Sequence, residues 1–312
     1  MTEGRLARRD VVRAALLTAG AVPLLAACGG RAAARTTGNS AYATIDQTGA
    51  VEHGPVGTGL PETPTLRRIR DRGVLLQSGS VTMAGFGLMN PRTGRITGFD
   101  AGIAQLLAKY LLGRPEVDTI TGGADTREAI LQNHSVDVAV STYTIKKSRA
   151  RLVNFSGPYY IARSGVLVAA NGHVVNALND LAGQEVAVQP GAAEEALRAG
   201  CPAAKPVVFE ESSQCSAAVR QGRVHAWSAN TAILLGKAAV DGRLRMTPVT
   251  FGSSPFGIGT PKDDPEFKKI VVGFLEKIMA DGTWRMLWEQ TVGVLAGTAA
   301  PEPPKLGSVP GS

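Results

Sequence analysis

The spacing of apolar positions along the chain predicts two long amphipathic helices. The first begins after Gly98-Phe99-Asp100, where the Asp100 carboxylate can cap the first turn, and its apolar residues recur three or four positions apart. The second spans residues 265–280, has one apolar face and is followed by Gly282, a residue typical of helix ends. The apolar residues of the two faces are Ile103, Leu106, Leu107 and Leu111, and Phe267, Ile270, Val271, Phe274 and Ile278.

Short apolar runs bounded by turn residues predict strands between the helices. Strands are expected at residues 74–77, 136–140, 165–169, 186–188 and 224–227, and shorter helices at residues 65–71 and 192–200. Strands that alternate with helices are typical of α/β folds with largely parallel sheets. In open sheets of this kind, ligands bind at the carboxyl ends of the strands, so we expect functional residues at strand-to-helix turns.

The N-terminus has the pattern of an export signal. Four arginines precede an apolar run over residues 14–25, and small residues lead to Cys28, as in a bacterial lipoprotein signal over residues 1–27. The run is about half the length of a membrane-spanning helix, so we expect anchoring at the extracytoplasmic face through lipid on Cys28. Arg8-Arg9 resembles the twin-arginine export signal. The alternative is a chance cysteine after an apolar segment.

Both ends of the remaining chain have the composition of unstructured segments. Residues 28–62 are rich in Gly, Ala, Thr and Pro without a sustained period, which predicts a flexible tether. Residues 296–312 contain four prolines and predict a disordered tail. About 230 residues remain for folded structure, enough for one large or two small domains.

Cysteine content and charge narrow the class of protein further. With Cys28 lipidated, Cys201 and Cys215 are left to form a disulfide in an oxidising compartment, the alternative being two buried free thiols. The chain has no C-x-x-C or H-E-x-x-H motif and its four histidines are isolated, so no metal or other cofactor is expected. The net charge of +7 is dispersed and no recognition helix is present, so no nucleic-acid partner is expected.

The strongest candidate site is the turn over residues 141–149, directly after a predicted strand. Thr144 at a helix start offers a hydroxyl and free N–H groups to an anion, and Arg149, five residues on, can turn back to clamp a carboxylate. This combination suits an α-carboxylate. The alternative is a plain threonine cap beside a solvated arginine.

Two further turns follow predicted strands. The Pro-Gly turn within residues 188–194 opens a helix whose free N–H groups can bind the same anion, unless it is only a connector. In the turn over residues 227–231, Asn230 can either cap the next helix or bind a ligand amide or ammonium.

Several ordered segments resemble one protein family. The chain is similar to the bacterial extracellular solute-binding proteins for polar amino acids, family 3, and within them most closely to actinobacterial glutamine- and glutamate-binding lipoproteins. The similarity covers residues 65–293. The segments that carry it are residues 70–75, 98–100, 141–149, 153–160, 180–183, 186–191, 256–259 and 281–284.

The resemblance implies a two-lobed α/β fold of the type II periplasmic-binding class. Lobe 1 would comprise residues 63–165 and 248–295, and lobe 2 residues 166–247. Two crossing strands would join the lobes, near residues 161–166 and 248–253, and the lobes would close on a ligand in the cleft between them.

The resemblance also assigns a carboxylate site. By motif match, Arg149 and Thr144 would bind the ligand's α-carboxylate, and Thr142 would assist through its backbone or hydroxyl. From lobe 2, Gly191 and Ala192 would offer N–H groups.

The rest of the implied ligand site follows the family pattern at two positions and departs from it at others. Phe86 would pack on the ligand, and Arg127 would lie near the ligand side chain. Asn230 stands where the family usually has an acid that pairs with the ligand's ammonium, and Thr82 stands where an acid is also common. His225 replaces a frequent Asp, and a packed or surface role is the simpler interpretation of it.

These observations predict a lipid-anchored, monomeric binding protein that captures a small polar carboxylate, an amino acid or a derivative, for an ABC importer. One alternative is a sensory lipoprotein that signals to a membrane partner. A second alternative is a cleft dehydratase, which would need a positioned acid. Glu194 and Glu195 are the acids that the sequence brings near the cleft, and both are more simply interpreted as first-turn acids of a helix. No catalytic residue is therefore expected.

Overall fold

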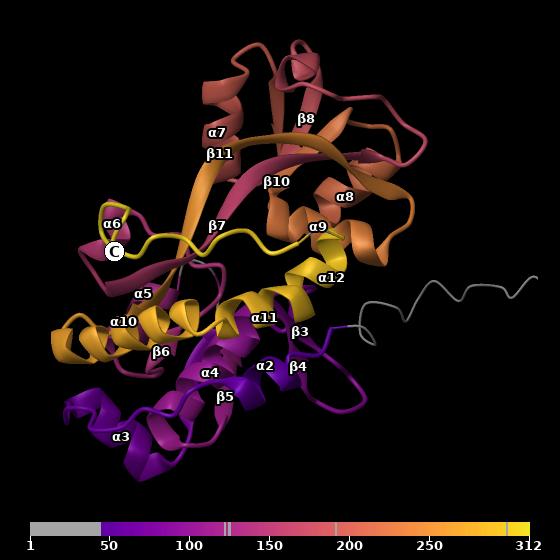
Figure 1. Ribbon diagram of the computed structural model, residues 1–312. Helices are drawn as coiled ribbons and strands as arrows, with labels where there is room; N and C mark the ends of the chain where they lie inside the picture. Colours follow the sequence, from indigo (N-terminus) through magenta and orange to yellow (C-terminus); the bar gives the residue numbers. More distant parts are fainter. Residues whose placement is uncertain (1–44, 122, 124–125, 191, 298) are drawn as a thin grey trace, which may run out of the picture. The chain divides into compact units, whose positions relative to one another are not determined.

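A computed structural model describes residues 45–121, 123, 126–190, 192–297 and 299–312, which build a mixed α/β unit around one eight-stranded sheet (Figure 1). The signal segment and Cys28 lie outside these residues. In the order of the sheet, the strands are β5 (Val117–Thr121), β1 (Leu75–Gly79), β6 (Val138–Ala139), β11 (Leu244–Thr260), β7 (Asn154–Ala169), β10 (Ala226–Asn230), β8 (Glu185–Val188) and β9 (Lys205–Val208). A second sheet contains β2 (Thr82–Met83), β3 (Gly87–Met89) and β4 (Ile96–Thr97).

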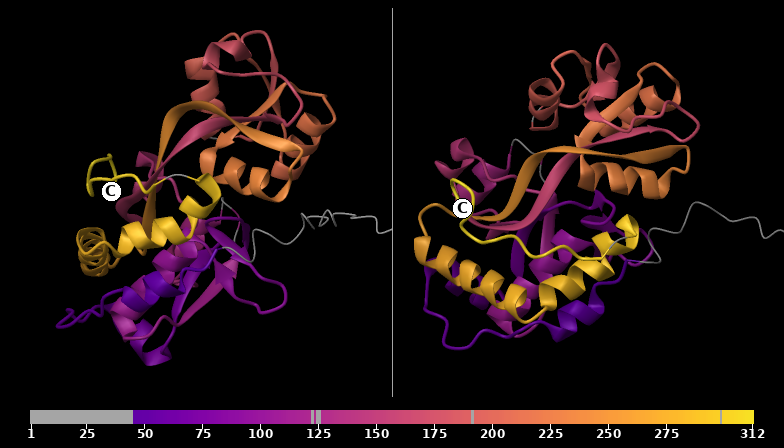
Figure 2. Two further views of the ribbon diagram at one scale, coloured as in Figure 1. Left: turned by 45° about the vertical axis from the view of Figure 1, so that its right-hand side comes forward. Right: turned by 45° about the horizontal axis from the view of Figure 1, so that its top comes forward.

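Two long antiparallel strands, β7 and β11, link the two halves of the sheet (Figure 2). Along β7, Tyr160 and Ala162 belong to one hydrophobic core, whereas Val166 and Val168 belong to another. The pairing of β7 with β11 shifts register between Phe251 and Ser254, which pair with Ser164 and Ala162. The shift thus lies where β7 passes from one core to the other. Each end of the strand pair thus serves a separate core, which we call lobe 1 and lobe 2. The expected two-lobed α/β fold is confirmed.

Lobe 1 is built around the predicted amphipathic helices. In α4 (Phe99–Leu112) the four apolar residues that define the predicted face are all buried, as are the five in α10 (Pro265–Ala280). Asp264 caps α10 by accepting a hydrogen bond from Phe267 N at 3.0 Å. The other helices of this lobe are α2 (Thr48–His53), α3 (Pro64–Arg72), α5 (Arg127–Gln132), α6 (Lys147–Ala150), α11 (Thr283–Gln290) and α12 (Val292–Ala296).

Lobe 2 has helices on both faces of its sheet, and this arrangement contradicts the expected disulfide. Cys201 packs in one hydrophobic core with Val166 and Val168, whereas Cys215 packs in the other with Leu167. Successive strand residues point to opposite faces of a sheet, so the sheet itself separates the two thiols. Both cysteines are free and buried. The helices are α7 (Ala192–Gly200), α8 (Ser212–Arg220), α9 (Thr231–Val240) and the 3₁₀ turn η1 (Leu178–Leu181).

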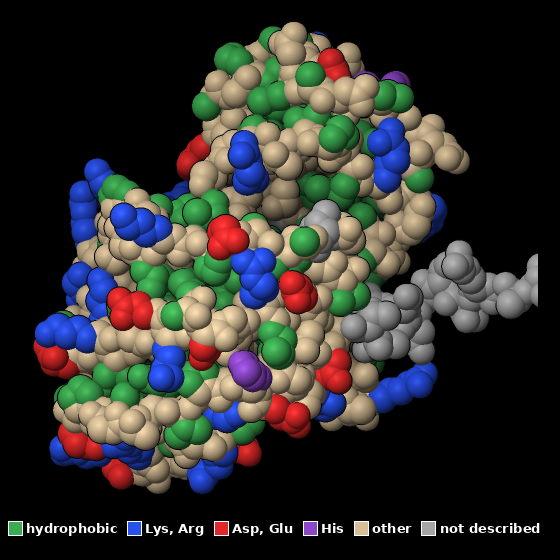
Figure 3. All heavy atoms as spheres, viewed as in Figure 1, with side chains coloured by type: hydrophobic (Ala, Val, Ile, Leu, Met, Phe, Trp, Pro, Cys, Tyr) green, Lys and Arg blue, Asp and Glu red, His purple; other side chains and the backbone are tan. Residues whose placement is uncertain are grey.

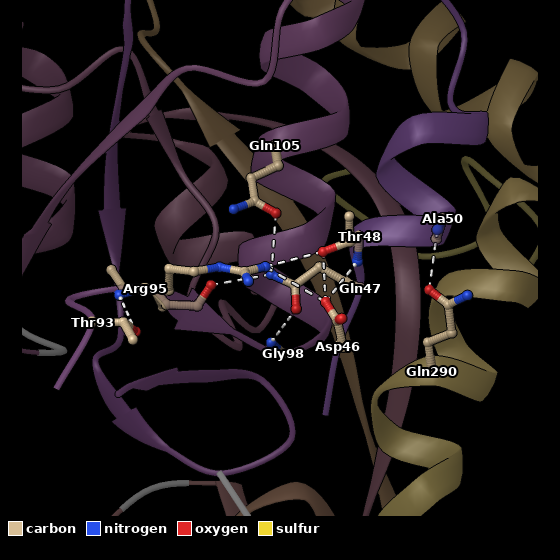
Figure 4. A network of polar contacts seen from close by, with 10 residues as sticks. Asp46, Gln47, Thr48, Ala50, Thr93, Arg95, Gly98, Gln105 and Gln290 are labelled. Carbon is tan, nitrogen blue, oxygen red and sulfur yellow. Dashed lines mark hydrogen bonds and ion pairs between the residues drawn. The ribbon is translucent and has the colours of Figure 1, made fainter. Parts of the chain in front are cut away.

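The tether expected over residues 28–62 is wrong for its second half, residues 45–62. Helix α2 buries Ala50 and Val51 against the lobe 1 core. Gln47 is also buried, and its amide donates to Ile96 O and Gln105 Oε1 at 3.1 Å (Figure 4). The composition of this segment suggested flexibility, but a few apolar side chains and one well-bonded amide hold it on the domain.

The disordered tail expected over residues 296–312 is also wrong. Residues 299–312, which we call the C-terminal strap, run from the end of α12 past β7 to α6 (Figure 1). Ala300 is buried in the lobe 1 core, Gly307 N donates to Gly157 O at 2.8 Å, and Val309 packs against the cluster that contains Tyr143. The prolines restrict the free chain as well, which reduces the entropy lost when the strap docks.

None of the helices within the described ranges combines the length and the hydropathy of a bilayer-crossing segment.

Candidate functional site

The turn after β6 is held in place by a buried carboxylate. Thr142 has a left-handed backbone conformation with φ of 45°, which is uncommon outside glycine. Its N–H donates to Asp100 Oδ2 at 2.6 Å, and the Tyr159 hydroxyl donates to Asp100 Oδ1 at 2.8 Å. Asp100 is only 2% exposed, and burial raises its pKa to about 6. The expected capping role of Asp100 is therefore wrong, because α4 is capped by Gly98 and the carboxylate serves the turn instead.

Arg149 turns back onto the start of its own turn. Its Nη1 donates to Thr144 O at 3.1 Å, and its guanidinium carbon lies 5.1 Å from the centroid of the buried Tyr143 ring, within cation–π range. Thr142 and Thr144 flank Tyr143 and are only half-buried. The turn thus presents two threonines and one arginine, the groups that the sequence predicted for a carboxylate site.

A second arginine faces the same tyrosine ring. Arg127, the first residue of α5, lies with its guanidinium carbon 5.4 Å from the Tyr143 centroid. Burial, and after it the charge of Arg149, lower the pKa of Arg127. Its Nε is buried and has no hydrogen-bond partner among the described residues. Two neighbouring guanidinium groups, one of them incompletely bonded, create a local preference for an anion.

Glu128 is a second acid at this turn, beside Asp100, and it could not be predicted from the sequence. Its Oε1 lies 3.1 Å from Arg149 Nε, and the exposed fractions of the two side chains are 15% and 25%. The Glu128 carboxylate also contributes, after burial, to raising the pKa of Tyr143. In the sequence, Glu128 looks like any acid in the first turn of a helix, so no local signal distinguishes it.

Thr82 lies at a cavity between the lobes. The cavity has a volume of about 450 Å³ and brings together β2 of lobe 1 and α9 of lobe 2. The helix approaches closely, because a β-carbon at Gly236 would lie 3.0 Å from Ala84 O. The surface is also recessed at the junction of the lobes (Figure 3). The lining residues are Thr82, Met83, Ala84, Leu88, Glu211, Ser212, Ser213, Ile233, Gly236, Lys237 and Val240.

Phe86 does not face this cavity. Its side chain is 1% exposed and packs edge-on against Tyr160, Phe256 and Phe99 at centroid distances of 5.3, 6.2 and 6.3 Å. The aromatic cluster fills the lobe 1 core beneath the turn. The expected contact between Phe86 and a ligand is therefore corrected, because its ring is already covered by protein.

The lobe 2 residues of the expected site lie at the ends of their strands and helices. Ala192 is the first residue of α7 and is half-buried, whereas Gly191 lies outside the described residues. Asn230 is the last residue of β10, paired in register with Ser164 of β7. His225 stacks on His173 with ring centroids 3.8 Å apart, which is a packed role.

Both acids of the α7 first turn interact with basic side chains. Glu194 accepts hydrogen bonds from Arg198 at 2.8 and 3.0 Å, and Glu195 faces Lys146 of lobe 1 at 3.8 Å. The second contact crosses between the lobes. Neither acid has the isolated, buried environment that a general acid requires.

Comparison with known proteins supports this description. The chain is 32% identical to the glutamine-binding protein of Geobacillus stearothermophilus over 212 residues, 66% of this chain and 80% of that protein. It is 28% identical to the ABC transporter glutamine-binding protein GlnH of Bacillus subtilis, covering 91% of this chain and 97% of the relative. A solved structure, the ancestral amino acid-binding protein AncCDT-1, a precursor of cyclohexadienyl dehydratase, matches with a TM-score of 0.63 and 30% identity, covering 73% and 99% of the two chains.

The family model for these proteins covers most of the folded chain. It matches residues 79–293, which include the turn with Thr144 and Arg149, both arginines at Tyr143, and the strands from β2 to β11. The expected family is thereby confirmed. The chain belongs to the bacterial extracellular solute-binding proteins, family 3.

Proposed function

We propose that this protein captures a polar amino acid between its two lobes and delivers it to an ABC importer. The observation that carries the proposal is the geometry of Arg149, whose guanidinium is fixed by Thr144 O and Glu128 beside two half-buried threonines. An arginine held in this way is preorganised to bind a carboxylate. Two relatives named as glutamine-binding proteins support glutamine, or a close analogue, as the ligand.

The second lobe would complete the site on closure. Ala192 is the first residue of α7, where free N–H groups and the helix dipole favour an anion, and Gly191 directly precedes it in the sequence. Asn230, at the end of the neighbouring β10, would offer an amide to the ligand. Thr82 lines the cavity between the lobes, whereas Arg127 faces the same tyrosine ring as Arg149, outside that lining. In this proposal both residues would lie near the ligand's side chain.

Binding without chemistry suits this arrangement better than catalysis. A dehydratase needs an acid that can exchange a proton with its substrate. Glu194 and Glu195 interact with Arg198 and Lys146, and Asp100 accepts two hydrogen bonds from the protein itself. The two curated relatives described above are both named as binding proteins.

A thermal-shift screen against amino acids, their amides, opines and small carboxylates tests the proposal. A ligand that binds only the native state stabilises that state by about 2.7 kcal/mol when its free concentration is one hundred times its Kd. The melting temperature then rises by a few degrees. We expect L-glutamine to be among the ligands that raise it. A full panel of free amino acids without any shift would contradict the proposed function.

We further propose that the protein is anchored to the outer face of the membrane through lipid on Cys28. Cys28→Ala should release the exported protein into the soluble fraction, because the residues that follow contain no long apolar run. Fractionation of washed membranes measures this, with Cys201→Ala as the control that keeps the anchor. If the exported Cys28→Ala protein stayed with the membranes, the anchor would have to lie elsewhere.

A further inference from the structure

Glu128 is a half-buried acid inside the proposed carboxylate site. It is the second residue of α5, whereas its partner Arg149 belongs to α6, so the fold brings together two residues that lie twenty-one positions apart. The two exposed fractions, 15% for Glu128 and 25% for Arg149, show that water has limited access to the pair. The carboxylate is therefore part of the site rather than of the open surface.

Arg149 keeps donors for a ligand while it contacts Glu128. A guanidinium has five N–H donors in a planar fork. Within the protein, Nε faces Glu128 and Nη1 donates to Thr144 O, both at 3.1 Å. Three N–H donors remain, one on Nη1 and two on Nη2, and these can donate to a ligand carboxylate. A ligand carboxylate can thus bind Arg149 without displacing Glu128.

An amino acid also brings an ammonium group on the same carbon as its carboxylate. Two guanidinium groups, Arg127 and Arg149, already face Tyr143, and a third cation beside them is unfavourable unless an acid lies nearby. Asp100 is closed to a ligand, because it is 2% exposed and accepts hydrogen bonds from Thr142 and Tyr159.

Glu128 has the capacity to accept this ammonium. An ionised carboxylate has about four lone-pair sites, and the ion pair with Arg149 needs only one of its two oxygens. Thr82 and Asn230 carry no charge. Among the described residues, Glu128 is the acid in ion-pair contact with Arg149.

We propose that Glu128 accepts the ligand's α-ammonium while Arg149 binds its carboxylate, so that lobe 1 alone recognises both charges of the zwitterion. This inference rests on the proposed function, in which the ligand is a free amino acid. It makes Glu128 a specificity-determining residue: it distinguishes an amino acid from the same carboxylate without the amine. The neutral Asn230 then needs no counter-charge of its own.

Calorimetry on the full-length exported protein and its Glu128→Gln variant tests the inference with matched probes. L-Glutamate is compared with glutarate, which is the same dicarboxylate without the ammonium, and L-glutamine with N-acetyl-L-glutamine. We expect Glu128→Gln to weaken L-glutamate and L-glutamine by about ten- to hundredfold, the range of a lost charge-assisted hydrogen bond. Any binding of glutarate or N-acetyl-L-glutamine should change by less than about threefold, well below that range.

Two controls separate this role from loss of structure or of charge. The melting temperature of the ligand-free Glu128→Gln protein should stay close to that of the wild type. Glu266→Gln removes the same charge at an exposed pair with Lys269 on α10 and should leave all four affinities unchanged.

The possible outcomes differ in their meaning. Equal weakening of probes with and without the ammonium would reduce Glu128 to a residue that positions Arg149, and equal tightening would make it a competitor of the ligand. Either result overturns the inference. It is also overturned if Glu128→Gln prefers ligands with the ammonium over ligands without it as strongly as the wild type does. A wild-type protein that binds neither L-glutamine nor L-glutamate would contradict the proposed function itself, and the inference with it.

Discussion

Arg149→Ala should weaken the binding of an amino acid by about 30-fold to several thousandfold, which corresponds to roughly 2 to 5 kcal/mol. The loss is large because the variant leaves the ligand carboxylate desolvated without its charged partner. It also removes the group that Glu128 and Thr144 O hold in place. Arg149→Lys should recover only part of the affinity, because an ammonium cannot reproduce the planar two-bond fork.

Calorimetry with the ligand found by thermal-shift screening measures this effect. Arg151→Ala is the matched control, since Arg151 is exposed and lies two residues further along the same turn. Its affinity should equal that of the wild type. An Arg149→Ala protein that melts normally and binds with unchanged affinity would show that the carboxylate site lies elsewhere.

Asp100→Asn should flatten the dependence of stability on pH. The pKa of Asp100 is raised from 3.8 to about 6, so the folded protein holds this proton more tightly than the unfolded chain. The resulting stabilisation is fully present below about pH 4 and is lost as the pH rises through 6. A rise of the pKa from 3.8 to about 6 corresponds to about 3 kcal/mol. The variant lacks this proton, so its stability should fall less over the same range.

Urea denaturation at pH 4.5 and pH 7.5 measures the difference. The comparison should use the change between the two pH values, because the amide also alters the hydrogen bonds to Thr142 and Tyr159 at every pH. Asp118→Asn, an exposed aspartate on β5, is the control and should behave like the wild type. Identical pH dependence in Asp100→Asn and wild type would mean that Asp100 stays ionised throughout.

Much of the fold could be predicted from the sequence where a signal is local. The apolar face of α10 repeats every three or four residues, and the structure has this helix over the predicted range, residues 265–280. The turn from Thr144 to Arg149 could also be predicted because its signal is local. Five residues suffice to bring the guanidinium back to Thr144 O. Asp100, in contrast, was assigned to a local cap and serves Thr142 instead, forty-two positions away.

The sequence by itself determined the amphipathic helices, the α/β class, the family and the arginine of the carboxylate turn, because each depends on periodicity or on a short ordered motif. Only the tertiary structure decided which distant residues meet. It separates Cys201 from Cys215 by a sheet, docks the C-terminal strap on lobe 1, and brings Glu128 to Arg149. Such contacts depend on which face of a strand or helix a residue occupies and on how elements far apart in the chain pack, and no local pattern encodes that pairing.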